Sequence, residues 1–206
     1  MQTYLDNLSD NVEEIDISGK RLKELPDLGR FHKLKILNCS FNQIENIDNL
    51  PVTLIMLNCS FNQIENIDNL PFTLITLYCY INKIKSLDNL PFTLIELCCH
   101  DNKIKSLDNL PFTLIILYCG RNKIKSLDNL PFTLMILYCY DNQIESLDNL
   151  PFTLMTLNCD SIIESVNYLK KIRLLKEISI TIKYSSLIEK WFLNRIKFNK
   201  KIFTMN

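Results

Sequence analysis

A repeat solenoid of the α/β class is predicted by three features of this 206-residue sequence. A 20-residue unit recurs from residue 34 onward, as in LPFTLIELCCHDNKIKSLDN at 90–109 and LPFTLIILYCGRNKIKSLDN at 110–129, and such a period is typical of stacked units. Within each unit, alternating apolar residues such as Leu57 and Cys59 favour a strand. The chain also has no alanine and only 3 glycines, and this lack of small residues disfavours a compact helical bundle.

Each unit is expected to contain one strand and an extended return segment. Twenty residues must supply a strand, two turns and the return, which leaves too few residues for a ten-residue helix on the far side. A proline in each unit also favours an extended return. These prolines are Pro51, Pro71, Pro91, Pro111, Pro131 and Pro151.

The repeated pattern Leu-x-x-Leu-x-Cys-x-x-Asn-x-Ile-x-x-Leu/Ile resembles the leucine-rich repeat family. Seven units share this register, with starts at residues 34, 54, 74, 94, 114, 134 and 154. The resemblance covers residues 12 to about 183 and is to the short 20-residue type with Leu-Pro at the end of each coil, found in bacterial effectors. Uncharacterised repeat proteins of giant DNA viruses look closer still. The resemblance to the leucine-rich repeat family implies a right-handed horseshoe with a parallel sheet on its concave face. It also implies partner binding more often than catalysis.

Three segments are predicted from the ends of the repeat array, because both ends of a solenoid need covers. They are an N-terminal cap at 1–11, a solenoid of about nine coils at 12–183, and a basic capping helix at 184–206. The first coil has 22 residues, with Lys20 at the asparagine position. A capping box from Ser186 to Glu189 opens the C-terminal helix, and a second from Ser161 opens a helical return at 161–171.

The cysteines are expected to form one inward-facing column of free thiols. Seven of the 8 recur at period 20, at Cys39, Cys59, Cys79, Cys99, Cys119, Cys139 and Cys159. Parallel Cβ vectors on neighbouring strands make the torsion of a disulfide hard to reach. Thiols that pack as small hydrophobes suit a reducing compartment, so a cytoplasmic location is expected, the host cytoplasm if the protein is viral.

Polar residues that recur in every coil are interpreted as scaffold. The asparagine that follows each strand, such as Asn62, is expected to satisfy backbone groups of neighbouring coils. The Asp-Asn pair before each Leu-Pro, such as Asp88-Asn89, is expected to close a turn by bonds from side chain to backbone. Strand alternation places Cys98 and His100 outward and Cys99 inward, so neither a zinc site nor a nucleophile pair is predicted.

The outward positions that differ between coils are the candidate binding site for a partner protein. Tyrosine-rich exposed strands are typical of protein-binding surfaces. The alternative is that these positions vary only because nothing packs on them. The candidate residues on the concave face are Tyr78, Tyr80, His100, Asp101, Tyr118, Arg121, Tyr138, Tyr140 and Asp141. The partner is unidentified, with a host protein as one candidate, and the chain itself is expected to be a monomer that takes no small-molecule substrate.

Charge gives one alternative function. Lys plus Arg equals Asp plus Glu at 23 each, so whole-chain charge indicates neither nucleic acid nor an anionic membrane. Residues 161–206, however, hold 10 basic and 3 acidic side chains, and an amphipathic helix there could bind either. The capping helix explains the same residues. With two histidines, no glycine-rich phosphate loop and no catalytic set outside the repeat, no enzyme, cofactor or metal is predicted.

Overall fold

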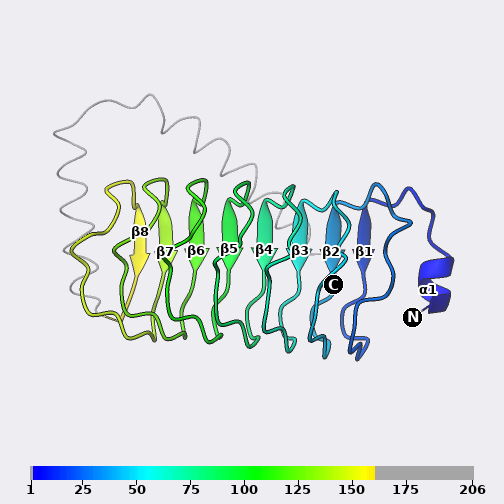
Figure 1. Cartoon of the computed structure of the whole chain (residues 1–206), viewed down its shortest axis with the longest axis horizontal. Coiled ribbons are helices and arrows are strands. Elements are labelled where there is room, and N and C mark those ends of the chain that lie inside the picture. The colour runs from blue at the N-terminus through cyan, green and yellow to red at the C-terminus, as the bar shows by residue number, and fades with distance from the viewer. Residues whose placement is uncertain (1, 161–206) are drawn as a thin grey trace, which may run out of the picture. The chain divides into compact units, whose positions relative to one another are not determined.

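The computed structural model describes residues 2–160 and contains one parallel sheet with its strands in chain order (Figure 1). A short helix, α1 (Gln2–Asp6), comes before the sheet. The strands are β1 (Glu14–Asp16), β2 (Ile36–Asn38), β3 (Met56–Asn58), β4 (Thr76–Tyr78), β5 (Glu96–Cys98), β6 (Ile116–Tyr118), β7 (Ile136–Tyr138) and β8 (Thr156–Asn158). The ninth strand, the helical return at 161–171 and the capping helix predicted from the sequence lie outside the described residues.

The 20-residue period fixes the register of the sheet. Leu97 of β5 pairs with Leu77 of β4 and with Leu117 of β6, so each strand lies beside the same residues one coil away. The first coil is longer, and Ile15 therefore pairs with Leu37, 22 residues further on. The structure confirms the stacked-strand prediction for these residues.

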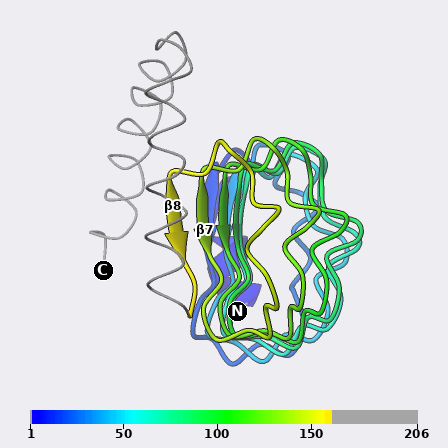
Figure 2. The ribbon, with the colours of Figure 1, turned by 90° about the vertical axis from the view of Figure 1, so that its left-hand side faces the viewer.

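The core lies between the sheet and the return segments. Seen along the stack, the coils superpose, with the strands on one side and the returns on the other (Figure 2). Leucines such as Leu57 and Leu97 and the cysteines between Cys39 and Cys139 in the predicted column are fully buried. Within residues 2–160 the only helix is α1, so the prediction of extended returns is confirmed for this part of the chain. In the same range, no helix has the length and apolar character needed to cross a bilayer.

Recurrent asparagines join neighbouring coils, as the sequence predicts. The Asn62 amide donates to the carbonyls of Cys39 (3.0 Å) and Cys59 (3.1 Å), and its Oδ1 accepts from the Ile44 amide (2.9 Å). Asn42 makes the same bond to the first coil by accepting from the Leu22 amide, and it also accepts from the amide of Lys20, which stands at the asparagine position of that coil, both at 3.0 Å. Each of these side chains therefore satisfies backbone groups that the sheet ladder leaves over.

The Asp-Asn pairs act differently from the prediction. Turns are closed by the residue two positions before each aspartate, since the Asp68 amide donates to Asn66 Oδ1 (2.7 Å). The aspartate side chain instead accepts from the next coil, where Asn89 Nδ2 lies 3.0 Å from Asp68 Oδ1. The same bond recurs from Asn109 to Asp88 at 2.8 Å. The pairs therefore form a ladder of side chains that links successive coils.

After each of the strands β1 to β7, the chain leaves the sheet through a residue in the left-handed conformation. At this position φ lies between 53° and 55° for Phe41, Phe61, Ile81, Asp101, Arg121 and Asp141, and Gly19 holds the equivalent position of the first coil with a φ of 65°. The conformation disfavours most side chains, and a β-branched residue such as Ile81 especially. A sheet-like bond holds it, as from the Phe61 amide to the Tyr80 carbonyl at 2.9 Å. The left-handed turn directs these side chains to the edge of the sheet where the strands end.

The N-terminal segment packs on the same core. Leu5 of α1 is buried, and Leu8 is partly buried against the core cluster. The Arg30 guanidinium donates to the Leu8 carbonyl (3.2 Å) and pairs with the Asp10 carboxylate (2.8 Å). These contacts attach residues 5–10 to the coil that precedes β2.

Candidate functional site

The variable side chains lie on one face of the sheet, which we call the outer sheet face. It consists of the first and third residues of each strand, the second residue after it, and the left-handed residue that follows. In β5 these are Glu96, Cys98, His100 and Asp101, while Leu97 and Cys99 point into the core and are fully buried. The predicted alternation of Cys98 and His100 outward with Cys99 inward is therefore confirmed.

Four aromatic rings form a continuous stack across this face. The Phe41 and Phe61 rings lie 4.1 Å apart and nearly parallel, and Phe61 meets Tyr80 edge-on at 5.4 Å. Tyr80 stacks on the His100 imidazole at 4.4 Å with an interplanar angle of 12°. Burial lowers the pKa of His100, which keeps the imidazole neutral near pH 7. The stack joins two different positions of the repeat, because Phe41 and Phe61 hold the left-handed position while Tyr80 and His100 come one residue before it. Comparison of a single position between coils therefore does not reveal the stack.

A second aromatic group occupies the next coils. Tyr118 and Tyr138 are half-buried, with ring centroids 4.9 Å apart. Tyr140 lies over Gly120, where an added Cβ would come within 2.8 Å of the tyrosine ring. The Arg121 guanidinium is 5.9 Å from the centroid of that ring. The missing side chain at Gly120 therefore gives Tyr140 its position, which explains a residue that looks like random variation in the sequence.

Tyr78 and Glu96 form a buried pair on the outer sheet face. Tyr78 is only 9% exposed, and its hydroxyl donates to Glu96 Oε1 at 3.0 Å. The sequence predicts an exposed Tyr78, so the structure differs at this residue. Glu96 is not among the residues predicted from the sequence for the binding surface, although it lies two residues before Cys98 on the same side of the strand. Its charge adds to the effect of burial in raising the pKa of Tyr118.

Charged candidates gather at the edge where the strands end. Arg121 lies between two carboxylates, with Nη1 3.6 Å from Asp101 Oδ2 and Nε 3.2 Å from Asp141 Oδ2. All three residues hold the left-handed position of their coils. Exposed pairs of this kind contribute little to stability, so their side chains remain available to a ligand.

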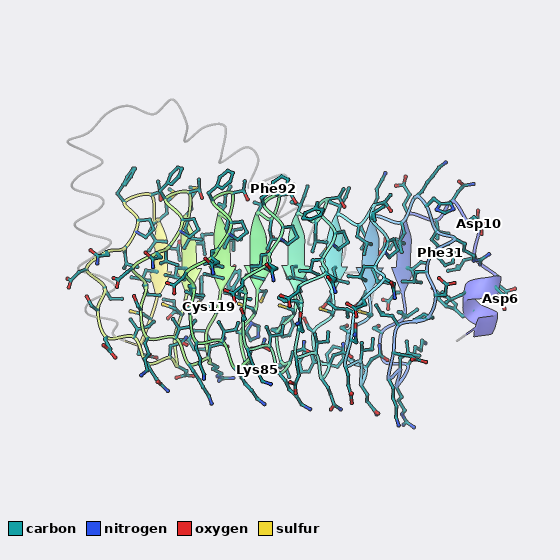
Figure 3. The ribbon with its side chains drawn as sticks, in the orientation of Figure 1. Asp6, Asp10, Phe31, Lys85, Phe92 and Cys119 are labelled. Carbon is teal, nitrogen blue, oxygen red and sulfur yellow. The ribbon has the colours of Figure 1, made fainter. Side chains whose placement is uncertain are left out.

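Lysines recur after the strands of three successive coils, on the stretch of chain that leads away from the sheet. Lys85, at the bottom of Figure 3, pairs with Glu65 of the preceding coil at 2.6 Å. Lys103, Lys105 and Lys125 are exposed. The lysines therefore do not belong to the outer sheet face.

The imidazole does not activate the neighbouring thiol. Cys98 Sγ lies 3.2 Å from His100 Nδ1. Burial, with a smaller effect from Glu96, raises the pKa of Cys98 to about 12, so the thiol stays protonated. In the described part of the chain, no cluster of three His, Cys, Asp or Glu side chains could hold a metal ion.

Native thiols are expected to resist alkylation. Burial raises the pKa of Cys39 and Cys139 to about 12, and the four thiols between them are shifted in the same direction. At pH 8, iodoacetamide should therefore label at most Cys98 in the folded protein, and all 8 cysteines after unfolding in guanidinium. Intact-protein mass spectrometry counts the labels. Rapid labelling of several native thiols would contradict the buried column.

Known repeat proteins share both the pattern and the geometry. Residues 10–52 match the family model described as Leucine Rich repeats (2 copies). The structure is similar to YopM, a leucine-rich effector protein from Yersinia pestis, with 32% identity and a TM-score of 0.67 over 73% of this chain and 43% of that chain. It is also similar to the LRR domain of a Shigella effector, with 25% identity and a TM-score of 0.66 over 82% of this chain and 78% of that chain.

A third similar structure also has a column of cysteines. It is the functional domain of InlJ from Listeria monocytogenes, with 25% identity and a TM-score of 0.55 over 72% of this chain and 44% of that chain, and it is described as including a cysteine ladder. This chain thus spans less than half the length of the YopM and InlJ structures. Comparison with curated protein sequences gave no match.

The fold is a leucine-rich repeat solenoid, and its structural neighbours include bacterial effector proteins, as the sequence predicts. These matches indicate no enzyme family. The resemblance to repeat proteins of giant DNA viruses is not shown by them and stays a prediction.

Proposed function

We propose that the outer sheet face binds a partner protein and that the chain acts as a non-enzymatic interaction module. The observation that supports this most is the pair of aromatic groups on the sheet, the stack from Phe41 to His100 and the group at Tyr118, Tyr138 and Tyr140. The fold supports it too, since leucine-rich repeat proteins are generally interaction scaffolds. The partner is proposed to be intracellular, a host protein being one candidate, because a column of free buried thiols suits a reducing compartment.

Rigid aromatic side chains favour binding for an energetic reason. Tyrosine supplies a large contact area at little cost in conformational entropy, and its hydroxyl gives direction to the contact. Here the rings are already held against one another on a hydrogen-bonded sheet, so binding requires little further ordering. Arg121 and its two aspartates border the aromatic group and add charged contacts at its rim.

Truncation of Tyr118 and Tyr138 to alanine should abolish partner capture and leave the fold intact. Both rings are half-buried at the surface, so each truncation removes contact area without opening the core. Proteins captured from lysate by the wild type and by Tyr118→Ala/Tyr138→Ala are compared by quantitative mass spectrometry. We expect at least about a tenfold loss of the specific partner, as for hot-spot residues. Circular dichroism confirms folding.

The matched control is Phe112→Ala/Phe132→Ala, which removes two exposed rings from the opposite edge of adjacent coils. It should capture the partner as the wild type does. Equal capture by the tyrosine variant and the wild type would contradict the proposal. Capture that needs residues 185–206 and vanishes at high salt would instead favour nucleic acid or an anionic membrane as the ligand.

A further inference from the structure

A row of exposed apolar side chains runs along the edge of the solenoid where the strands begin. Each is the residue that follows Leu-Pro, and Phe92 marks the row at the top of Figure 3. We call these residues the phenylalanine band: Val52 (77% exposed), Phe72 (72%), Phe92 (59%), Phe112 (63%), Phe132 (65%) and Phe152 (68%). The band is separate from the outer sheet face, and the proposed function does not use it.

The band is held rigidly by the threonine that follows each of its members. Thr93 Oγ1 donates to the carbonyl of Phe72 (2.7 Å) and to that of Leu74 (2.8 Å), both in the preceding coil. The same pair of bonds recurs from Thr73 to Thr153. The Phe72 and Phe92 rings lie 6.2 Å apart with an interplanar angle of 27°. The backbone under the band is thus fixed from coil to coil, and its rings follow the coil spacing.

The area of the band is that of a protein interface. A phenylalanine has roughly 150–250 Å² of surface, so six side chains at these exposures present on the order of 700 Å². The largest apolar patch on a typical monomer is about 300–600 Å². A standard interface buries about 800 Å² on each partner. The band thus exceeds an ordinary surface patch and approaches the size that a stable dimer needs.

We propose that the phenylalanine band is a self-association surface that binds the same band of a second copy of this chain. Five consecutive coils present the same ring, so the band is uniform along its length, unlike the outer sheet face. Rings that repeat at the spacing of the coils pack most closely against another surface whose side chains repeat at that spacing. A second copy of this chain has the same coil spacing. A two-fold axis along the row is the usual way to bring one patch onto itself. This differs from the monomer expected from the sequence.

Charge near the band disfavours an anionic lipid surface as the occupant. An aspartate lies four residues before each phenylalanine, as Asp88 does before Phe92. Hydrogen bonds from Ser86 and Asn109 lower the pKa of Asp88, and bonds from Ser106 and Asn129 lower that of Asp108, so both carboxylates are ionised at pH 7. In a dimer whose two-fold axis runs along the band, the aspartates of one copy lie on one side of the axis and those of the second copy lie on the other side. The two rows of aspartates therefore do not face each other across the interface.

Sedimentation velocity of the full chain between about 1 and 100 µM tests the proposal. The wild type should approach twice its monomer mass of 24.2 kDa. Phe92→Glu/Phe112→Glu should weaken the dimer at least about tenfold, because a charge buried in an apolar interface is costly. The matched control, Phe41→Glu/Ile81→Glu, adds the same charge at exposed apolar residues on the opposite edge and should dimerise as the wild type does. Circular dichroism establishes that each variant is folded.

Two results would overturn the proposal: a wild type that stays monomeric over this range, or a dimer that tolerates Phe92→Glu/Phe112→Glu. Vesicles of neutral phosphatidylcholine distinguish the other occupant. A wild type that is monomeric in buffer and binds these vesicles, with binding lost in the glutamate variant, would identify the band as a lipid contact and reject the dimer. Partner capture by the glutamate variant tests the outer sheet face independently, so failure of one proposal leaves the other standing.

Discussion

Replacing Asn102 with alanine should lower the free energy of unfolding by about 3 kcal/mol, a large fraction of the stability of most domains. The Asn102 Oδ1 accepts from the Ile84 amide (2.9 Å), which loses this acceptor in the variant. Its Nδ2 donates to the carbonyls of Cys79 and Cys99 at 3.1 Å. In the variant the Cys79 carbonyl keeps the Asn82 amide as a donor, and the Cys99 carbonyl keeps the Asn122 amide. The expected loss of about 3 kcal/mol combines the Ile84 amide, which is left without an acceptor, with the Cys79 and Cys99 carbonyls, which each lose one donor. Urea denaturation followed by circular dichroism measures the change.

Asn109→Ala is the matched control in the same coil. Asn109 is exposed and donates one bond, to Asp88 Oδ1 at 2.8 Å. Water replaces a lost bond at such a site, so the change should stay within about 0.5 kcal/mol. If Asn102→Ala cost no more than Asn109→Ala, the recurrent asparagines would not be the links that hold coil to coil.

Sequence periodicity predicts the strands well because the repeat fixes both the position of each strand and its pairing. Once Leu57 and Leu77 occupy the same place in consecutive units, a parallel stack leaves them one register in which to pair. The inward column of cysteines follows from the same alternation. The extended return follows from the length of the unit and its proline.

Interactions between coils were harder to predict because a repeat shows what recurs and not which coil it contacts. The Asp-Asn pair looks the same whether it closes its own turn or bonds to the next coil, and the structure shows that Asn89 reaches back to Asp68. Gly120 is intelligible only beside Tyr140, which is 20 residues away in the sequence. Such contacts require the three-dimensional neighbour as well as the residue.

The phenylalanine band could not be predicted from the sequence because its residues recur in the repeat as core residues do. Phe72 and Phe92 recur between coils just as the buried leucines around them do, so the repeat pattern alone does not distinguish the two kinds of residue. Only the geometry distinguishes the two, because Leu74 is fully buried while Phe72 is 72% exposed. A constant residue can therefore be a surface feature when the surface itself is repeated.

Deletion of residues 94–113 should leave a folded protein one coil shorter. The deletion joins Thr93 to Leu114, which restores the 20-residue unit, and Leu77 can then pair with Leu117 as it now pairs with Leu97. Every recurrent bond has its replacement in the next coil, so only one set of nearest-neighbour contacts is lost. The free energy of unfolding should fall by less than about 2 kcal/mol, measured by urea denaturation.

Deletion of residues 94–114 removes one residue more and should lower that free energy by at least about 3 kcal/mol further, the cost of losing a buried leucine. A coil can accommodate extra residues, as the 22-residue first coil does, but a return segment that is already extended cannot make up for a missing residue. A one-residue slip would also turn its leucines out of the core. Equal stability of the two deletions would show that register does not specify this fold. The 20-residue deletion also removes Glu96, His100 and Asp101 from the outer sheet face, so a chain that folds and no longer captures its partner would separate the residues that bind from those that only stack.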